Sequence, residues 1–165
     1  MAGRYADALP LLEESVGLIH APSPHPLLSY ALLNLGWARL GLGDRDGARV
    51  AFRRAFREAT SADEQARARA LGALARVAVH DQPRLGAVLF GAAEQVRRVV
   101  GLGVSVPDRP VHATTEEALR EALGETAFAE AFEEGTRLSG DEVGALACAP
   151  VRSFAAAAVE RAPAG

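Results

Sequence analysis

Histidines, one cysteine and several carboxylates are the side chains of this 165-residue chain that could carry chemistry. A zinc site needs about four convergent ligands. The histidines are scattered, have no cysteine partner and lack the His-Glu-x-x-His spacing, and each falls in a segment predicted to connect two helices. We therefore predict no metal ligand and no cofactor. The histidines are His20, His25, His80 and His112.

Catalytic patterns are equally sparse. Cys148 has no basic neighbour in the sequence, which is typical of a partly buried, inert thiol. Paired carboxylates could act as general acid and base, but acidic runs on helices are usually solvated faces. We therefore predict no catalytic residue and no enzymatic activity. The carboxylates considered are Glu116, Glu117, Glu121, Glu130, Glu133 and Glu134.

Two glycine pairs, Gly41-x-Gly43 and Gly101-x-Gly103, are the only hints of a nucleotide loop. A dinucleotide-binding turn needs a third glycine, and the chain has Asp46 and Val106 at those positions. The sequence also contains no lysine, so it cannot supply a Walker A loop. Both pairs are predicted to be turns.

The charge distribution argues against a nucleic-acid binder. Residues 1–100 carry 13 arginines against 10 acids, and residues 101–165 carry 5 against 11, which gives +3 and −6. Neither value approaches a strongly basic footprint. Arg49, Arg53 and Arg57 form an i,i+4 ladder that could meet an acidic partner, although we favour a solvated stripe. We predict no direct contact with nucleic acid.

The elements that must position these side chains are helices. The chain is 49% hydrophobic but only 5% aromatic, and alanine and leucine dominate its apolar residues, which predicts an all-α fold. It lacks an apolar run of 18 residues and a signal peptide at its start, so we expect a cytoplasmic protein that contacts no membrane. A single cysteine excludes an internal disulfide.

Apolar periodicity predicts five helices in residues 1–100. Their approximate ranges are Tyr5 to Ile19, Leu27 to Leu40, Arg45 to Ala59, a helix that starts near Ser61, and Leu85 to Val99. Pro26 could open the second helix, and a capping box of Ser61 and Glu64 predicts the start of the fourth. Glu94 and Arg98 are expected to pair at an i,i+4 spacing on the last of these.

Residues 101–113 are the longest segment without helical periodicity. Capping boxes of Thr114 with Glu117 and of Ser139 with Glu142 then predict further helices, and another helix carries Phe128 and Phe132. We predict helical repeats in residues 1–100, a linker in 101–113, a C-terminal helical segment in 114–162 that packs on the array, and a tail in 163–165.

A small–large–small spacing recurs three times and predicts helices that lie closely against other helices. Stacked copies of such a unit form a solenoid with a long concave surface. The three copies are Ala8, Leu12, Ser15, then Ala48, Phe52, Ala55, then Gly86, Phe90, Ala93.

These spacings resemble the tetratricopeptide repeat. The middle copy carries the resemblance best, with Leu35 and Gly36 in its first helix, Gly43 and Asp44 at its turn, then Ala48, Phe52 and Ala55. The resemblance implies an antiparallel helix-hairpin solenoid of about 2.5 repeats, followed by a C-terminal helical cap. Equivalent points recur about every 40 residues, longer than the usual 34.

In the tetratricopeptide pattern the first helix of each repeat lines the concave groove. The resemblance therefore implies that Tyr30, Asn34 and Trp37 form a ligand- or partner-binding face. Trp and Tyr are prominent in binding hot spots, although Trp37 could equally pack between consecutive repeats. The expected occupant is a protein or peptide, or a small-molecule inducer, and a homo-oligomer is possible.

A narrower resemblance covers most of the chain, with its motifs between residues 88 and 143. The stretch Val88-Leu89-Phe90-Gly91-Ala92-Ala93-Glu94 and the later Phe128-Ala129-Glu130-Ala131-Phe132 are similar to the C-terminal sensor region of large bacterial LuxR-type ATPase regulators. The resemblance implies a non-catalytic sensor or protein-interaction module of a transcriptional regulator, separated from its neighbouring domains. The alternatives are a standalone adaptor that bridges proteins, or a small enzyme with an interhelical pocket.

Overall fold

The computed structural model describes residues 2–19, 25–60 and 62–149. Over these residues the chain is all-α, as predicted, with eight α-helices, one 3-10 turn and no strand. The elements are α1 (Ala2–Leu18), α2 (Pro26–Gly41), α3 (Arg45–Glu58), α4 (Glu64–Ala78), α5 (Pro83–Val99), η1 (Val106–Asp108), α6 (Arg109–Leu123), α7 (Glu125–Arg137) and α8 (Gly140–Cys148).

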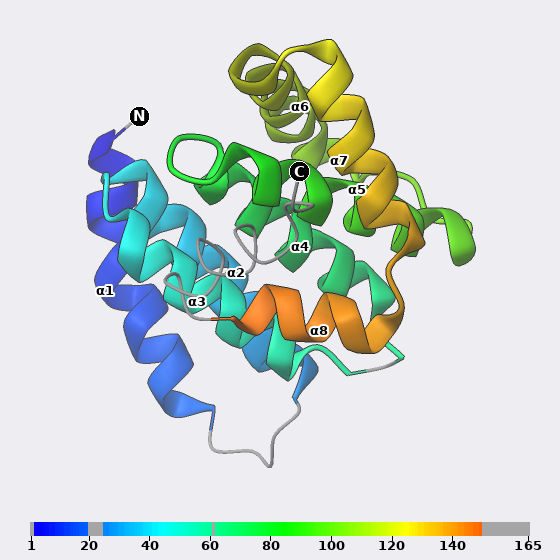
Figure 1. The fold of residues 1–165 in the computed structure, drawn as a ribbon. Coiled ribbons are helices and arrows are strands. Elements are labelled where there is room, and N and C mark those ends of the chain that lie inside the picture. Colours follow the sequence, from blue (N-terminus) through cyan, green and yellow to red (C-terminus); the bar gives the residue numbers. More distant parts are fainter. Residues whose placement is uncertain (1, 20–24, 61, 150–165) are drawn as a thin grey trace.

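Helices α1 to α5 pack against their neighbours in chain order, and α2 also contacts α4 (Figure 1). The order changes after α5. Helix α7, and not α6, lies closely along α5, while α6 bridges α5 and α7. Helix α8 then returns across the array to contact α5 and α3. One continuous apolar core joins α2, α3, α4, α5, α6, α7 and α8.

Phe52 and Phe90 are the large members of two of the predicted triplets, and both lie in the core. Their small partners Ala48, Ala55 and Ala93 are fully buried as well. Gly36 on α2 makes room for Phe52: a Cβ added there would lie 2.8 Å from one ring carbon and closer still to two others. The first triplet differs, because Ser15 is exposed.

Two glycines allow α5 and α7 to cross with almost no gap. A Cβ on Gly91 would lie 2.9 Å from the carbonyl carbon of Phe132, and one on Gly135 would lie 2.8 Å from that of Val88. Both added atoms would lie still closer to the carbonyl oxygens. Because helix backbones cannot yield as a flexible side chain does, this crossing requires glycine at both positions.

Helix starts follow the predicted residues only in part. Pro26 opens α2, as predicted, since a proline in the first turn removes no helical hydrogen bond. The box predicted for α4 is wrong, because the side chain of Asp63 caps this helix by accepting from the Ala66 N–H at 3.0 Å. Ser61 lies outside the described residues.

The segment after α5 also departs from the prediction. Helix α6 begins at Arg109, within the expected linker, because Pro110 fits the first turn of a helix as readily as it fits a loop. Thr114 therefore lies inside α6, where its hydroxyl donates to the Pro110 carbonyl, and it caps nothing. The box of Ser139 and Glu142 at α8 is confirmed. The predicted final helix lies outside the described residues.

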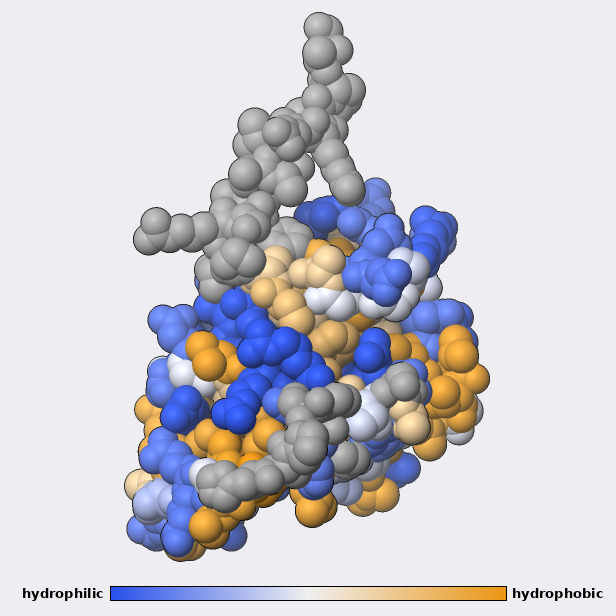
Figure 2. All heavy atoms as spheres, turned by 90° about the horizontal axis from the view of Figure 1, so that it is seen from below, coloured by the Kyte–Doolittle hydropathy of each residue, from blue (hydrophilic) through white to orange (hydrophobic). Residues whose placement is uncertain are grey.

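The surface mixes polar and apolar side chains. Figure 2 shows a band of hydrophilic residues on the underside, flanked by hydrophobic ones. Leu11 and Leu18 on α1 are each about two-thirds exposed. Among the helices of the described residues, none has both the length and the apolar character needed to cross a membrane.

Candidate binding site

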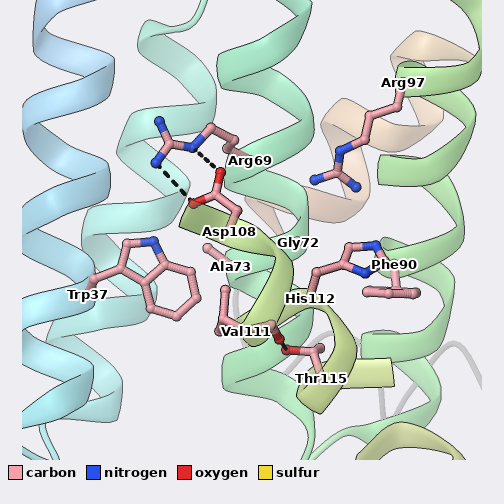
Figure 3. Close-up of a pocket in the computed structure, with 10 residues that line it drawn as sticks. All are labelled: Trp37, Arg69, Gly72, Ala73, Phe90, Arg97, Asp108, Val111, His112 and Thr115. Carbon is pink, nitrogen blue, oxygen red and sulfur yellow. Dashed lines mark hydrogen bonds and ion pairs between the residues drawn. The ribbon is translucent and has the colours of Figure 1, made fainter. Parts of the chain in front are cut away.

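A hollow lies where α2, α4 and α5 meet the start of α6 (Figure 3). Trp37 forms its wall on the α2 side, Arg69 comes from α4, and Arg97 from α5. Residues of η1 and α6 close the remaining side. The complete lining is Trp37, Arg69, Gly72, Ala73, Phe90, Arg97, Asp108, Val111, His112 and Thr115.

The hollow is small, with about 30 Å³ open to water-sized molecules. A single water needs about 10–15 Å³, so the hollow has room for two or three water molecules. Trp37 is half-buried, and its ring packs edge-on against Phe52, with ring centroids 5.1 Å apart. The indole is thus held by the core on one side and presented to the hollow on the other.

Arg69 links three elements at one edge of the hollow. Its guanidinium meets Asp108 through two contacts, Nε to Oδ2 at 2.9 Å and Nη2 to Oδ1 at 3.3 Å. The same guanidinium lies 5.6 Å from the centre of the Tyr30 ring, a cation–π contact. Tyr30 in turn donates its hydroxyl proton to Asp63 at 3.3 Å. Arg69 therefore joins α2, α4 and η1.

A second polar cluster lies on the α5 side. Arg97 is only 6% exposed, and it pairs with Glu94 and donates to the Ala68 carbonyl at 3.4 Å. His112 reaches the same carboxylate, with Nε2 and Oε1 2.8 Å apart, while its ring lies 4.7 Å from that of Phe90. The pair predicted between Glu94 and Arg98 is wrong, because Glu94 turns toward α6.

Burial alone would raise the pKa of Glu94. The hydrogen bond from His112 and the charge on Arg97 outweigh it, so the pKa of this carboxyl lies below its ordinary value. A carboxyl with a depressed pKa in the folded state stabilises the fold above its unfolded pKa, and this contribution is lost as pH falls through the folded value.

Glu94→Gln is therefore expected to destabilise the protein at pH 7 and to matter less in acid. We expect a loss of about 1–2 kcal/mol at neutral pH, since two charge-assisted hydrogen bonds disappear. Urea unfolding at pH values from 7 down to 3 should show the wild-type and Glu94→Gln curves converging below about pH 4.5. Glu117→Gln, at an exposed position on α6, is the control, and a difference that grows in acid would contradict the assignment.

Two of the three residues predicted to bind a partner lie at or beside the hollow. Trp37 lines the hollow, and Tyr30 lies against Arg69 one step away. Asn34 lies between them in the sequence on the same helix but is exposed and takes no part in the lining. The prediction missed Arg69, Arg97, Asp108 and His112. Arg69 lies between two alanines, Arg97 between Val96 and Arg98, and neither Asp108 nor His112 belongs to a recognisable motif, so no spacing marked them.

His112 belongs to α6, and its predicted place in a connection is wrong. Within the described residues, no group of three or more His, Cys, Asp or Glu side chains could hold a metal ion. Cys148 is a half-buried free thiol.

Several residues of the predicted charged stripes are paired with nearby residues of opposite charge. Glu116 pairs with Arg120 at 2.9 Å, and Glu133 with Arg137. Arg49 on the arginine ladder pairs with Asp81 at 2.5 Å. Burial, and then the charge on Arg49, lower the pKa of the neighbouring Arg53 guanidinium.

No protein-family model, no curated protein and no solved structure matches this chain.

Proposed function

We propose that this chain is a non-catalytic helical-repeat binding module with a tetratricopeptide-like solenoid at its centre. The short connection between α2 and α3, and the further contact of α2 with α4, support hairpins stacked in register. Gly36, Asp44 and Phe52 are used as a repeat would use them: Gly36 makes room for Phe52, and Asp44 caps the second helix by accepting from Gly47.

One observation carries the proposal: aromatic and cationic side chains from α2 and α4, the first helices of two consecutive proposed repeats, lie together on one face. Tyr30 and Trp37 of α2 are seven residues apart and so share a helix face, and Arg69 of α4 lies beside them. Trp, Tyr and Arg are the residues most enriched in binding hot spots. We call Tyr30, Trp37 and Arg69 the α2–α4 face.

The size of the hollow favours a protein segment over an inducer. Pockets for small molecules usually enclose about 300–1,000 Å³, an order of magnitude more than is available beside Trp37. A peptide needs only shallow pockets for one or two side chains. We place the module in a bacterial transcriptional regulator of the LuxR type, with a standalone adaptor as the second candidate. A small enzyme with an interhelical pocket is the third candidate.

Trp37→Ala is expected to weaken partner binding at least tenfold, as is usual for loss of a central tryptophan. A photo-crosslinking amino acid at position 34, on the exposed surface of α2, would capture the partner, which is then purified and titrated by calorimetry. Val50→Ala removes a side chain from the exposed side of α3 and serves as the control. Equal affinity of the Trp37→Ala and wild-type proteins would refute binding at this face.

A further inference from the structure

The α2–α4 face already has an occupant, which is the chain itself. Residues of η1 and the first turns of α6 lie over Trp37 and Arg69 (Figure 3). Asp108 presents both carboxylate oxygens to the Arg69 fork, at 2.9 and 3.3 Å. This two-point geometry is the one by which arginine recognises a carboxylate in a partner protein.

Asp108 makes this contact instead of capping α6. It occupies the N-cap position of α6, where an aspartate ordinarily accepts a hydrogen bond from the backbone of the first turn, but its side chain makes no such bond. Its carboxylate is held by Arg69 and by the Ser105 hydroxyl, which donates at 2.6 Å. If another carboxylate binds Arg69, the Asp108 side chain can instead cap α6 by accepting a hydrogen bond from its first turn.

The segment around Asp108 is lightly attached. No residue of η1 is buried. Within the described part of the chain, the Asp108–Arg69 pair is the only hydrogen bond or ion pair between residues 103–108 and helices α1 to α5. Helix α6 has its own attachments farther along, the buried Thr115 and Leu119 and the contact of His112 with Glu94. Residues 103–108 can therefore leave while α6 stays in place.

We infer that Arg69 is the receptor for an acidic side chain of the partner protein, and that Asp108 holds this position until the partner displaces η1. The inference rests on the proposed function and specifies its partner: a peptide segment with an aspartate or glutamate for Arg69 and an apolar residue for Trp37. The Asp108–Arg69 pair is partly exposed on both sides, so its exchange for a similar pair changes the free energy little.

The first test uses the protein alone. Asp108→Asn and Arg69→Gln should each speed hydrogen exchange of the Asp108 and Arg109 amides, which bond to the Ser105 carbonyl, by about fivefold. Acrylamide should quench Trp37, the single tryptophan of the chain, more strongly in both variants. Asp141→Asn, an exposed acid on α8, is the matched control. If neither amide exchange nor Trp37 quenching changes in either variant, the proposal that η1 is displaced is refuted.

The second test addresses partner chemistry. A random dodecapeptide library displayed on phage is selected on the Asp108→Asn protein, in which the ion pair with Arg69 is lost. We expect enriched peptides to carry an aspartate or glutamate and to lose at least tenfold in affinity when Arg69→Gln is added. The proposal that Arg69 binds a carboxylate would be refuted if no peptide is enriched or if the enriched peptides lack an acidic residue. It would also be refuted if their affinity does not depend on Arg69.

The two proposals fail separately. If Trp37→Ala leaves the affinity of the captured partner unchanged, the binding face is wrong whatever η1 does. A second outcome is that Trp37→Ala weakens partner binding while Asp108→Asn neither speeds amide exchange nor strengthens partner binding. In that case the α2–α4 face is the binding site, and the proposed displacement of η1 is wrong.

Discussion

Replacing Phe52 with alanine is expected to lower the free energy of unfolding by about 3–5 kcal/mol. The phenyl ring is fully buried between α2 and α3, contacts Trp37 edge-on and fills the space above Gly36. The neighbouring helices are tied to other partners and cannot close the resulting cavity. Urea unfolding followed by circular dichroism measures the loss.

The control is Val50→Ala, which truncates an exposed side chain two residues away and should change the free energy of unfolding by less than about 0.5 kcal/mol. Gly36→Ala supplies a second check. It should destabilise the wild-type protein, because the added methyl group meets the Phe52 ring, and do little in the Phe52→Ala background, where the ring is absent. Equal losses in both backgrounds would contradict this packing.

Gly91→Ala should be nearly as damaging, at about 3 kcal/mol, although it adds only one methyl group. The new atom would meet the backbone carbonyl of Phe132, and the only relief is to move α5 and α7 apart along their whole contact. For a chain of this size such a loss lowers the melting temperature by about 6–12 °C, which differential scanning calorimetry resolves.

Gly144→Ala is the matched control for the glycine crossing. This glycine lies inside α8 with open space around its Cβ position, so alanine should leave stability unchanged or raise it by up to about 1 kcal/mol. Gly135→Ala should add little to Gly91→Ala, because helices that have already separated accommodate both methyl groups. Full additivity would show that the two glycines do not share one crossing.

The helices were predictable because their signals are local. Apolar periodicity and the start of α2 at Pro26 act within a few residues, and the structure confirms them. The errors arise where two local signals compete. Asp63 caps α4, whereas the sequence predicted Ser61 for this role. Pro110 lies in the first turn of α6, whereas the sequence predicted a loop there.

The candidate site was predictable only on one side. Trp37 and Tyr30 were expected from the tetratricopeptide resemblance, which implies that their helix lines a groove, and the structure has them at or beside the hollow. Arg69 and Asp108 come together across 39 residues of sequence, and nothing in either local stretch specifies that pairing. It follows from the path of the chain after α5, where α7 crosses α5 at two glycines and α6 packs against α5 and α7, with a smaller contact to α4. The crossing of α5 and α7 depends on residues far apart in the sequence, so no local pattern predicts it.

The return of α8 to α3 sets the order in which this chain can fold. Most contacts among α1 to α5 join helices adjacent in the chain, so their loop-closure entropy is small and we expect them to form early. Helix α8 closes the longest loop and contributes only two buried side chains, Val143 and Ala147. It therefore docks last, on a surface that the earlier hairpins have already built, and is the first helix of that core to detach during unfolding.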